Sequence, residues 1–183
     1  SMVSRRLYPS NVLAGKIKKL LPNTTIIAGG PHINDFPKRT MEGTPVDFVI
    51  SGYAEKSFPQ FIEALDQSNQ SFEFLEKIPG LYYRVNGEIR SNPDTEAPIV
   101  LDDMPFPKRE LVDLNEYFTA ADNEKMTTIY TSRGCPYKCT FCDVQDKTYH
   151  YRTSKSIVDE FEYIMSLGIR EIHIFDDTFN MGR

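Results

Sequence analysis

Two spacings of hydrophobic residues alternate along the chain, and together they predict an α/β protein. Apolar residues recur at helical spacing over residues 12–21, 58–65 and 157–165. Short β-branched or aromatic runs that favour strands occupy residues 25–28, 47–51, 127–131 and 171–175. Because helical and extended patterns alternate rather than segregate, we expect sheets covered by helices.

The predicted helices carry recognisable ends. Ser10 precedes the first helix and Pro22 ends it, because proline cannot continue a helix. Thr153 and Ser154 are candidate caps of the last helix, and Gly168 is its candidate stop. These signals place the helix boundaries independently of the apolar spacing.

The order of the elements predicts two α/β parts. Residues 1–70 read as helix, strand, loop, strand and helix, which fits the back half of a doubly wound, flavodoxin-like domain. Residues 127–183 read as strand, loop, helix and strand, which predicts a right-handed parallel crossover. Ligands bind at the carboxyl ends of parallel strands, so the loop after residue 131 and Asp176-Asp177 are expected at one rim.

Residues 71–126 are predicted to connect the two parts. Asn86-Gly87 lies between two extended runs, and this pair accepts the positive φ angles of a tight type I′ hairpin turn. The following segment is rich in proline and is expected to lack regular structure. Within it, Leu101, Met104 and Phe106 are expected to pack an ordered loop, a structural role rather than a catalytic one.

Composition excludes several classes of protein. The chain is 40% hydrophobic and 26% charged, which is ordinary for a globular protein, and no apolar run approaches the length of a membrane span. Its net charge of −5 argues against nonspecific nucleic-acid binding, which needs clustered excess Lys and Arg. Without an export signal, and with free thiols to preserve, a reducing cytoplasm is the expected location.

The candidate chemistry is concentrated in one short segment. Cys135, Cys139 and Cys142 are the only three cysteines of the chain, in a Cys-x3-Cys-x2-Cys pattern. Thiolates this close on one loop can converge on a single metal centre. Structural zinc and ferredoxin-type clusters take four ligands, whereas a 4Fe-4S cluster held by three thiolates keeps one iron open to a further ligand.

Two other interpretations of these cysteines remain open. A zinc site could be completed by His150 or Asp143, because Cys3His zinc sites are common and both residues follow closely. A disulfide would leave one cysteine over and would strain the short loop. Zinc is the more serious competitor of the two.

The residues around the cysteines resemble a known family. Arg133-Gly134 precedes the first cysteine, Pro136 follows it, and Phe141 precedes the third. This segment is similar to the cluster loop of the radical S-adenosylmethionine (radical SAM) enzymes. The resemblance implies that Cys135, Cys139 and Cys142 hold a 4Fe-4S cluster at the start of a partial TIM barrel.

The same resemblance implies a cofactor and a reaction. In radical SAM enzymes the open iron chelates S-adenosylmethionine (SAM). A donor such as flavodoxin or ferredoxin reduces the cluster, which passes one electron to the sulfonium of SAM, and a 5′-deoxyadenosyl radical is released. Phe141 would pack near the adenine. Asp176 or Asp177 falls where the family places a polar group for the SAM amino nitrogen, although the usual Gly-Gly-Glu form is absent.

The first part resembles a second module. Gly29-Gly30-Pro31-His32, residues 46–52 and Glu55 are similar to the cobalamin-binding domain that precedes the radical SAM domain in one class of these enzymes. There the paired glycines line the groove for the nucleotide tail of cobalamin. The Asp-x-His-x-x-Gly segment with the cobalt-ligating histidine is absent, and His32 does not occupy that position.

These resemblances divide the chain and suggest its function. Residues 1–70 correspond to the C-terminal half of a cobalamin-binding-like domain, 71–126 to the connector, and 127–183 to the N-terminal part of a radical SAM domain. Each domain is shorter than a complete one, and Ser1-Met2 resembles a tag remnant, so we expect a fragment that is inactive alone.

The function expected for the whole enzyme is cobalamin-dependent methyl transfer or rearrangement on an unknown small-molecule or peptide substrate. The alternatives are a zinc-stabilised binding module without radical chemistry, and a radical SAM enzyme that does not use cobalamin.

Overall fold

The computed structural model describes residues 7–67, 73–94, 100–119, 124–142, 144, 148–179 and 181. The chain forms two compact units, Ser1–Ala97 and Pro98–Arg183.

The first unit is a mixed sheet with helices. Its elements are α1 (Leu7–Leu20), β1 (Ile27–Ala28), α2 (Pro31–Asp35), α3 (Pro37–Gly43), β2 (Phe48–Ile50), α4 (Ala54–Gln67), the 3-10 helix Leu75–Lys77, β3 (Leu81–Val85) and β4 (Glu88–Ser91). The strands expected at residues 25–28 and 47–51 are confirmed in shortened form. The short helices α2 and α3 were not predicted, because neither is long enough to show a helical period.

The sheet has the order β1-β2-β3-β4. β1 and β2 are parallel, with Ile27 opposite Phe48, whereas β3 runs antiparallel to β2 and to β4. Asn86 (φ 51°) and Gly87 (φ 84°) form the predicted tight turn of the hairpin. This hairpin was expected in the connector, but it extends the sheet of the first unit. The sequence pattern gives the hairpin but not its partner strand.

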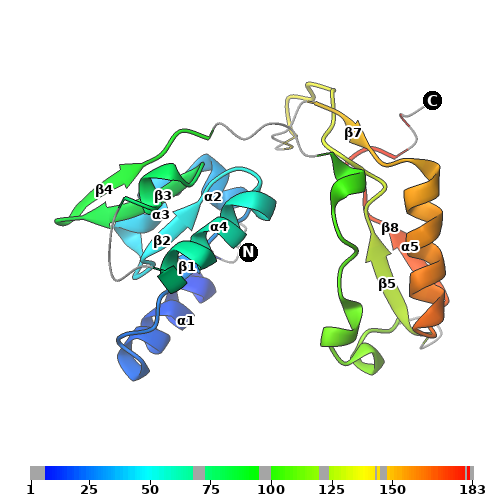
Figure 1. Cartoon of the computed structure of the whole chain (residues 1–183), viewed down its shortest axis with the longest axis horizontal. Helices are drawn as coiled ribbons and strands as arrows, with labels where there is room; N and C mark the ends of the chain where they lie inside the picture. Colours follow the sequence, from blue (N-terminus) through cyan, green and yellow to red (C-terminus); the bar gives the residue numbers. More distant parts are fainter. Residues whose placement is uncertain are drawn as a thin grey trace. The chain divides into compact units, whose positions relative to one another are not determined.

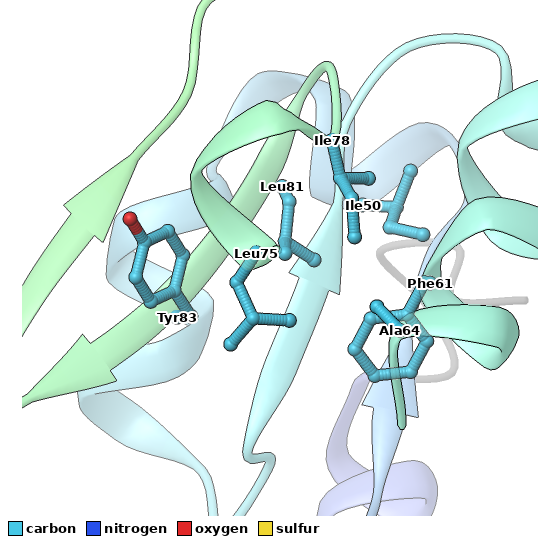
Figure 2. Packing of buried hydrophobic residues seen from close by; sticks show 7 residues of the cluster. All are labelled: Ile50, Phe61, Ala64, Leu75, Ile78, Leu81 and Tyr83. Atoms are coloured by element: carbon cyan, nitrogen blue, oxygen red, sulfur yellow. The ribbon is translucent and has the colours of Figure 1, made fainter. Parts of the chain in front are cut away.

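The two faces of this sheet bury separate clusters, because side chains alternate along each strand. Ile50 and Leu81 pack with Phe61 and Ala64 of α4 on one face, as Figure 2 shows. Val49 of β2 lies in the other cluster, with side chains from α2 and α3. The sheet therefore lies between two helical layers, with α4 on one side and α2 and α3 on the other (Figure 1).

The second unit is built around a parallel pair of strands. Its elements are the 3-10 helices Leu101–Asp103, Arg109–Leu111 and Leu114–Glu116, then β5 (Met126–Ile129), β6 (Ser132–Arg133), β7 (His150–Tyr151), α5 (Ser154–Ser166) and β8 (Glu171–Ile174). β5 and β8 pair in parallel from Met126–Glu171 to Ile129–Ile174, which confirms the predicted parallel connection. The short antiparallel pair β6–β7 was not predicted.

Helix α5 packs along the β5–β8 pair (Figure 1). Its buried Ile164 meets Ile129 of β5 and Ile169, and each such fully buried side chain contributes about 1.5–3 kcal/mol. Thr153 is the N-cap, accepting a hydrogen bond from the Ser156 N–H, and Gly168 follows the helix at φ 77°. Both predicted ends of this helix are confirmed.

Among the residues that the structure describes, no helix combines enough length with enough hydrophobicity to cross a bilayer.

Candidate cysteine-loop site

The cysteine loop, residues 132–142, and the segment Asp176–Thr178 lie at the same edge of the second unit. The loop follows β5, and Asp176–Thr178 follows β8. The strands are parallel and in register, and the Phe175 N–H donates to the Ile129 carbonyl at 2.8 Å, one step beyond the last paired residues. The expectation that the two segments meet at one rim is therefore confirmed.

Asp176 holds the start of the loop. One of its carboxylate oxygens accepts hydrogen bonds from the backbone N–H groups of Thr131, at 2.7 Å, and Ser132, at 3.1 Å. Its other oxygen accepts from the Thr131 hydroxyl. Bonds to an ionised acceptor are stronger than neutral ones, so this single side chain fixes the direction in which the chain leaves β5.

The next two residues hold the loop further along. A carboxylate oxygen of Asp177 accepts from the Gly134 N–H at 3.1 Å, and Gly134 has φ 82°, where a side chain would be strained. The Thr178 hydroxyl lies 2.8 Å from Cys135 Sγ and donates to it. We call Asp176, Asp177 and Thr178 the loop clamp. It reaches the first cysteine.

The second half of the loop is more open. Cys135 is buried, whereas Cys139 and Cys142 are exposed. The Cys142 N–H donates to the Cys139 carbonyl at 3.2 Å, so the Cys-x2-Cys pair brackets a turn. Phe141, which the family resemblance would place near an adenine, is 91% exposed. Its predicted role stays a prediction.

The three cysteines match a cluster in the kind of donor they supply, although they are not gathered around one point. In the part of the chain described by the structure, no three His, Cys, Asp or Glu side chains gather closely enough to hold a metal ion. The donors themselves fit in kind, because all three thiols are free and two are open to solvent. For the zinc alternative, His150 lies in β7, and Asp143 lies outside the described residues.

The two aspartates predicted near SAM are hydrogen-bonded to the cysteine loop, with Asp176 partly buried and Asp177 exposed. Both oxygens of Asp176 and one of Asp177 already accept hydrogen bonds from loop residues. Their predicted contact with the SAM amino nitrogen stays a prediction. What the sequence did not show is that they position the cysteine loop, because the partners are 43–45 residues apart.

A second polar cluster, absent from the sequence-based expectations, lies in the same unit. Glu160 of α5 accepts from Arg109 at 2.7 Å through one oxygen and from Arg152 through the other. All three side chains are at least nine-tenths buried. Arg109 also donates to the Thr128 carbonyl of β5 at 2.9 Å. We call Arg109, Arg152 and Glu160 the connector clamp, because it fixes the proline-rich segment to the β5–α5 pair.

The proline-rich segment also caps α5. Asp102 accepts from the Thr153 N–H at 3.0 and 3.1 Å, and Phe106 lies near Arg152, whose guanidinium carbon is 5.5 Å from the ring centroid. Burial alone would raise the pKa of Asp102, but hydrogen bonds from Thr153 and Ser156 outweigh it and leave that pKa below its usual value. Leu101 is buried, and the expected structural role of this segment is confirmed.

In the first unit, the predicted glycine pair follows β1. Gly30 has φ 119° and precedes α2, a conformation that requires glycine. Gly29 has an ordinary conformation, and a side chain there would meet the Ile50 carbonyl oxygen only at 3.5 Å. A cavity of about 650 Å³ in this unit is lined by residues of α1, α2 and α3, and neither glycine lines it. The predicted contact with cobalamin stays a prediction.

Comparison with known proteins finds relatives that match almost the whole chain. No protein-family model matches it. It is 30% identical to an uncharacterized methyltransferase of Pyrococcus horikoshii, over 97% of the chain and 38% of that protein. It is 27% identical to the cobalamin-dependent radical SAM methyltransferase TokK of Streptomyces tokunonensis, over 92% of the chain and 25% of that protein.

A solved structure shares the fold. The radical SAM methyltransferase TsrM of Kitasatospora setae, determined with cobalamin and a [4Fe-4S] cluster bound, matches with a TM-score of 0.68 at 20% identity, over 96% of this chain and 34% of that one. The chain thus spans between a quarter and two fifths of the proteins it resembles. Together with the cysteine loop, these similarities show that the chain belongs to the radical SAM enzymes that carry a cobalamin-binding domain.

Proposed function

We propose that this chain is part of a radical SAM methyltransferase, in which Cys135, Cys139 and Cys142 hold a [4Fe-4S] cluster. The observation that carries the proposal is the anchored cysteine loop at the carboxyl end of β5. The relatives named above are methyltransferases, which supports methyl transfer as the reaction. The cluster, when bound, supplies the electron for reductive cleavage of SAM.

The residues of the chain have distinct parts in this proposal. The three thiolates bind the cluster and leave one iron for SAM, while Asp176 and Asp177 fix the backbone that presents Cys135. The first unit supplies the surface for cobalamin beside Gly29 and Gly30. The acceptor is a small molecule, and a flavodoxin or ferredoxin delivers the electron.

Metal content tests the cluster. The chain is purified without oxygen and reconstituted with iron and sulfide, and we expect about four irons and four sulfides per chain. Cys139→Ala should lose most of both, whereas Thr140→Ala, a matched change at the neighbouring exposed position, should keep them. One zinc per chain with no sulfide would overturn the cluster in favour of the zinc-stabilised module.

Corrinoid binding tests the first unit separately. We expect hydroxocobalamin added to the chain to co-elute with it and to change its visible spectrum. Gly29→Ala should weaken binding without unfolding the unit, since its Cβ has room against the protein but would push away a ligand lying on the backbone. Gly15→Ala in α1, where nothing lies within 4 Å, is the control. Cluster formation without corrinoid binding would favour a radical SAM enzyme that does not use cobalamin.

A further inference from the structure

Thr178, which follows β8, is hydrogen-bonded through its side chain to a cysteine sulfur. Its hydroxyl donates to Cys135 Sγ at 2.8 Å. Cys135 is 9% exposed, whereas Cys139 and Cys142 are open to solvent. The bond therefore lies at the cysteine where water competes least, and hydrogen bonds are strongest in such surroundings.

The position of Thr178 is fixed by neighbouring bonds rather than by the sulfur contact alone. The Ser132 hydroxyl donates to the Thr178 carbonyl at 3.4 Å, and Ser132 is 1% exposed. Two residues earlier, Asp176 accepts from the Ser132 N–H at 3.1 Å. Ser132 is thus bonded to both Asp176 and Thr178, so the residue that carries the hydroxyl is held in place.

We propose that Thr178 is a positioning residue for the cluster, and that its hydroxyl raises the reduction potential of the cluster through the Cys135 thiolate. This inference rests on the proposed function. Adding an electron to a cluster increases the negative charge on its sulfur ligands. A hydrogen-bond donor stabilises that added charge, and hydrogen bonds to the sulfurs are one of the factors that set cluster potentials.

The test measures potential rather than turnover. The reconstituted chain and three variants are titrated anaerobically with a low-potential reductant, and the reduced cluster is counted by electron paramagnetic resonance. Thr178→Val removes the donor at nearly constant volume, and Thr178→Ser keeps it. Thr128→Val, an exposed threonine of β5, is the control for the same chemical change elsewhere.

We expect Thr178→Val to lower the equilibrium constant for one-electron reduction by about tenfold, which is about 59 mV to lower potential. Thr178→Ser and Thr128→Val should stay close to the unchanged chain. Equal potentials in Thr178→Val and the unchanged chain, each with four irons, would overturn the inference and leave the proposed function intact. No cluster in the unchanged chain would overturn both.

A variant that does not assemble a cluster is also informative. If Thr178→Val and Thr178→Ala keep the circular dichroism of the folded chain but lose iron, while Thr178→Ser retains it, the hydroxyl is needed to position Cys135, as proposed. Loss of iron from Thr178→Ser as well would contradict the role of the hydroxyl, because that variant keeps the donor.

Discussion

The two clamps of the second unit both hold β5, by different means. The connector clamp uses three charged side chains that are at least nine-tenths buried, and its bonds run to a helix, a strand and the proline-rich segment. The loop clamp is partly buried and acts on backbone N–H groups and one sulfur at the strand ends. A buried charge is costly when it loses its partner, whereas a backbone bond at a rim is lost more cheaply. The first clamp should govern stability, and the second should govern the geometry of the loop.

The largest effect is expected from breaking the connector clamp. Glu160→Ala would leave Arg109 and Arg152 buried side by side without their shared carboxylate. We expect the free energy of unfolding to fall by about 3–5 kcal/mol, measured by urea denaturation. Glu162→Ala, at an exposed position of the same helix, should change it by less than about 0.5 kcal/mol. Similar small losses in both variants would show that the buried network does not support the unit.

Breaking the loop clamp should destabilise the unit less than breaking the connector clamp does, but it should lower the iron content more. Asp176→Asn keeps the shape and one acceptor oxygen but removes the charge that strengthens three bonds. We expect a loss of about 1.5–3 kcal/mol by urea denaturation, together with reduced iron after reconstitution. Asp177→Asn, which affects a single described bond to the loop, should lose less of both. If Glu160→Ala, in conditions where it stays folded, lost more iron than Asp176→Asn, the division between the clamps would be wrong.

The cap of α5 offers an intermediate test, because it involves neither clamp directly. Thr153→Ala removes the side-chain oxygen that accepts from the Ser156 N–H. The expected loss is about 0.5–2 kcal/mol in thermal or urea unfolding, with the iron content unchanged. Ser154→Ala, one residue into the helix, should be nearly neutral. A fall in iron content in Thr153→Ala would mean that the helix and the loop are coupled more closely than the hydrogen bonds suggest.

The smallest effect concerns the contact of Asp102 with the start of α5. Its pKa is lower in the folded chain than in the unfolded one, so the folded state favours the ionised form. The stabilisation is complete above the unfolded-state pKa, near 3.9, and is lost as the pH falls through the lower folded-state pKa. When the pH is lowered from 5 to 3, the melting temperature of Asp102→Asn should fall less than that of the unchanged chain. Parallel pH profiles would show that Asp102 adds no pH-dependent stability.

Much of the local structure could be predicted from the sequence. Helix α5, its Thr153 cap and its Gly168 end, and the Asn86-Gly87 turn all depend on residues within a few positions of one another. Local signals of this kind do not report which strands pair. The sequence therefore assigned the hairpin to the connector, although in the structure β3 pairs with β2 of the first unit.

The sequence by itself determined the three long helices α1, α4 and α5, the parallel order of β5 and β8, and a loop bearing three thiols at a strand end. Only the tertiary structure decided what holds that loop. Asp176 and Thr131, Thr178 and Cys135, and Arg109 and Glu160 are 45, 43 and 51 residues apart. Single polar residues at such separations leave no periodic pattern, because their pairing depends on how strands and helices pack and not on spacing along the chain.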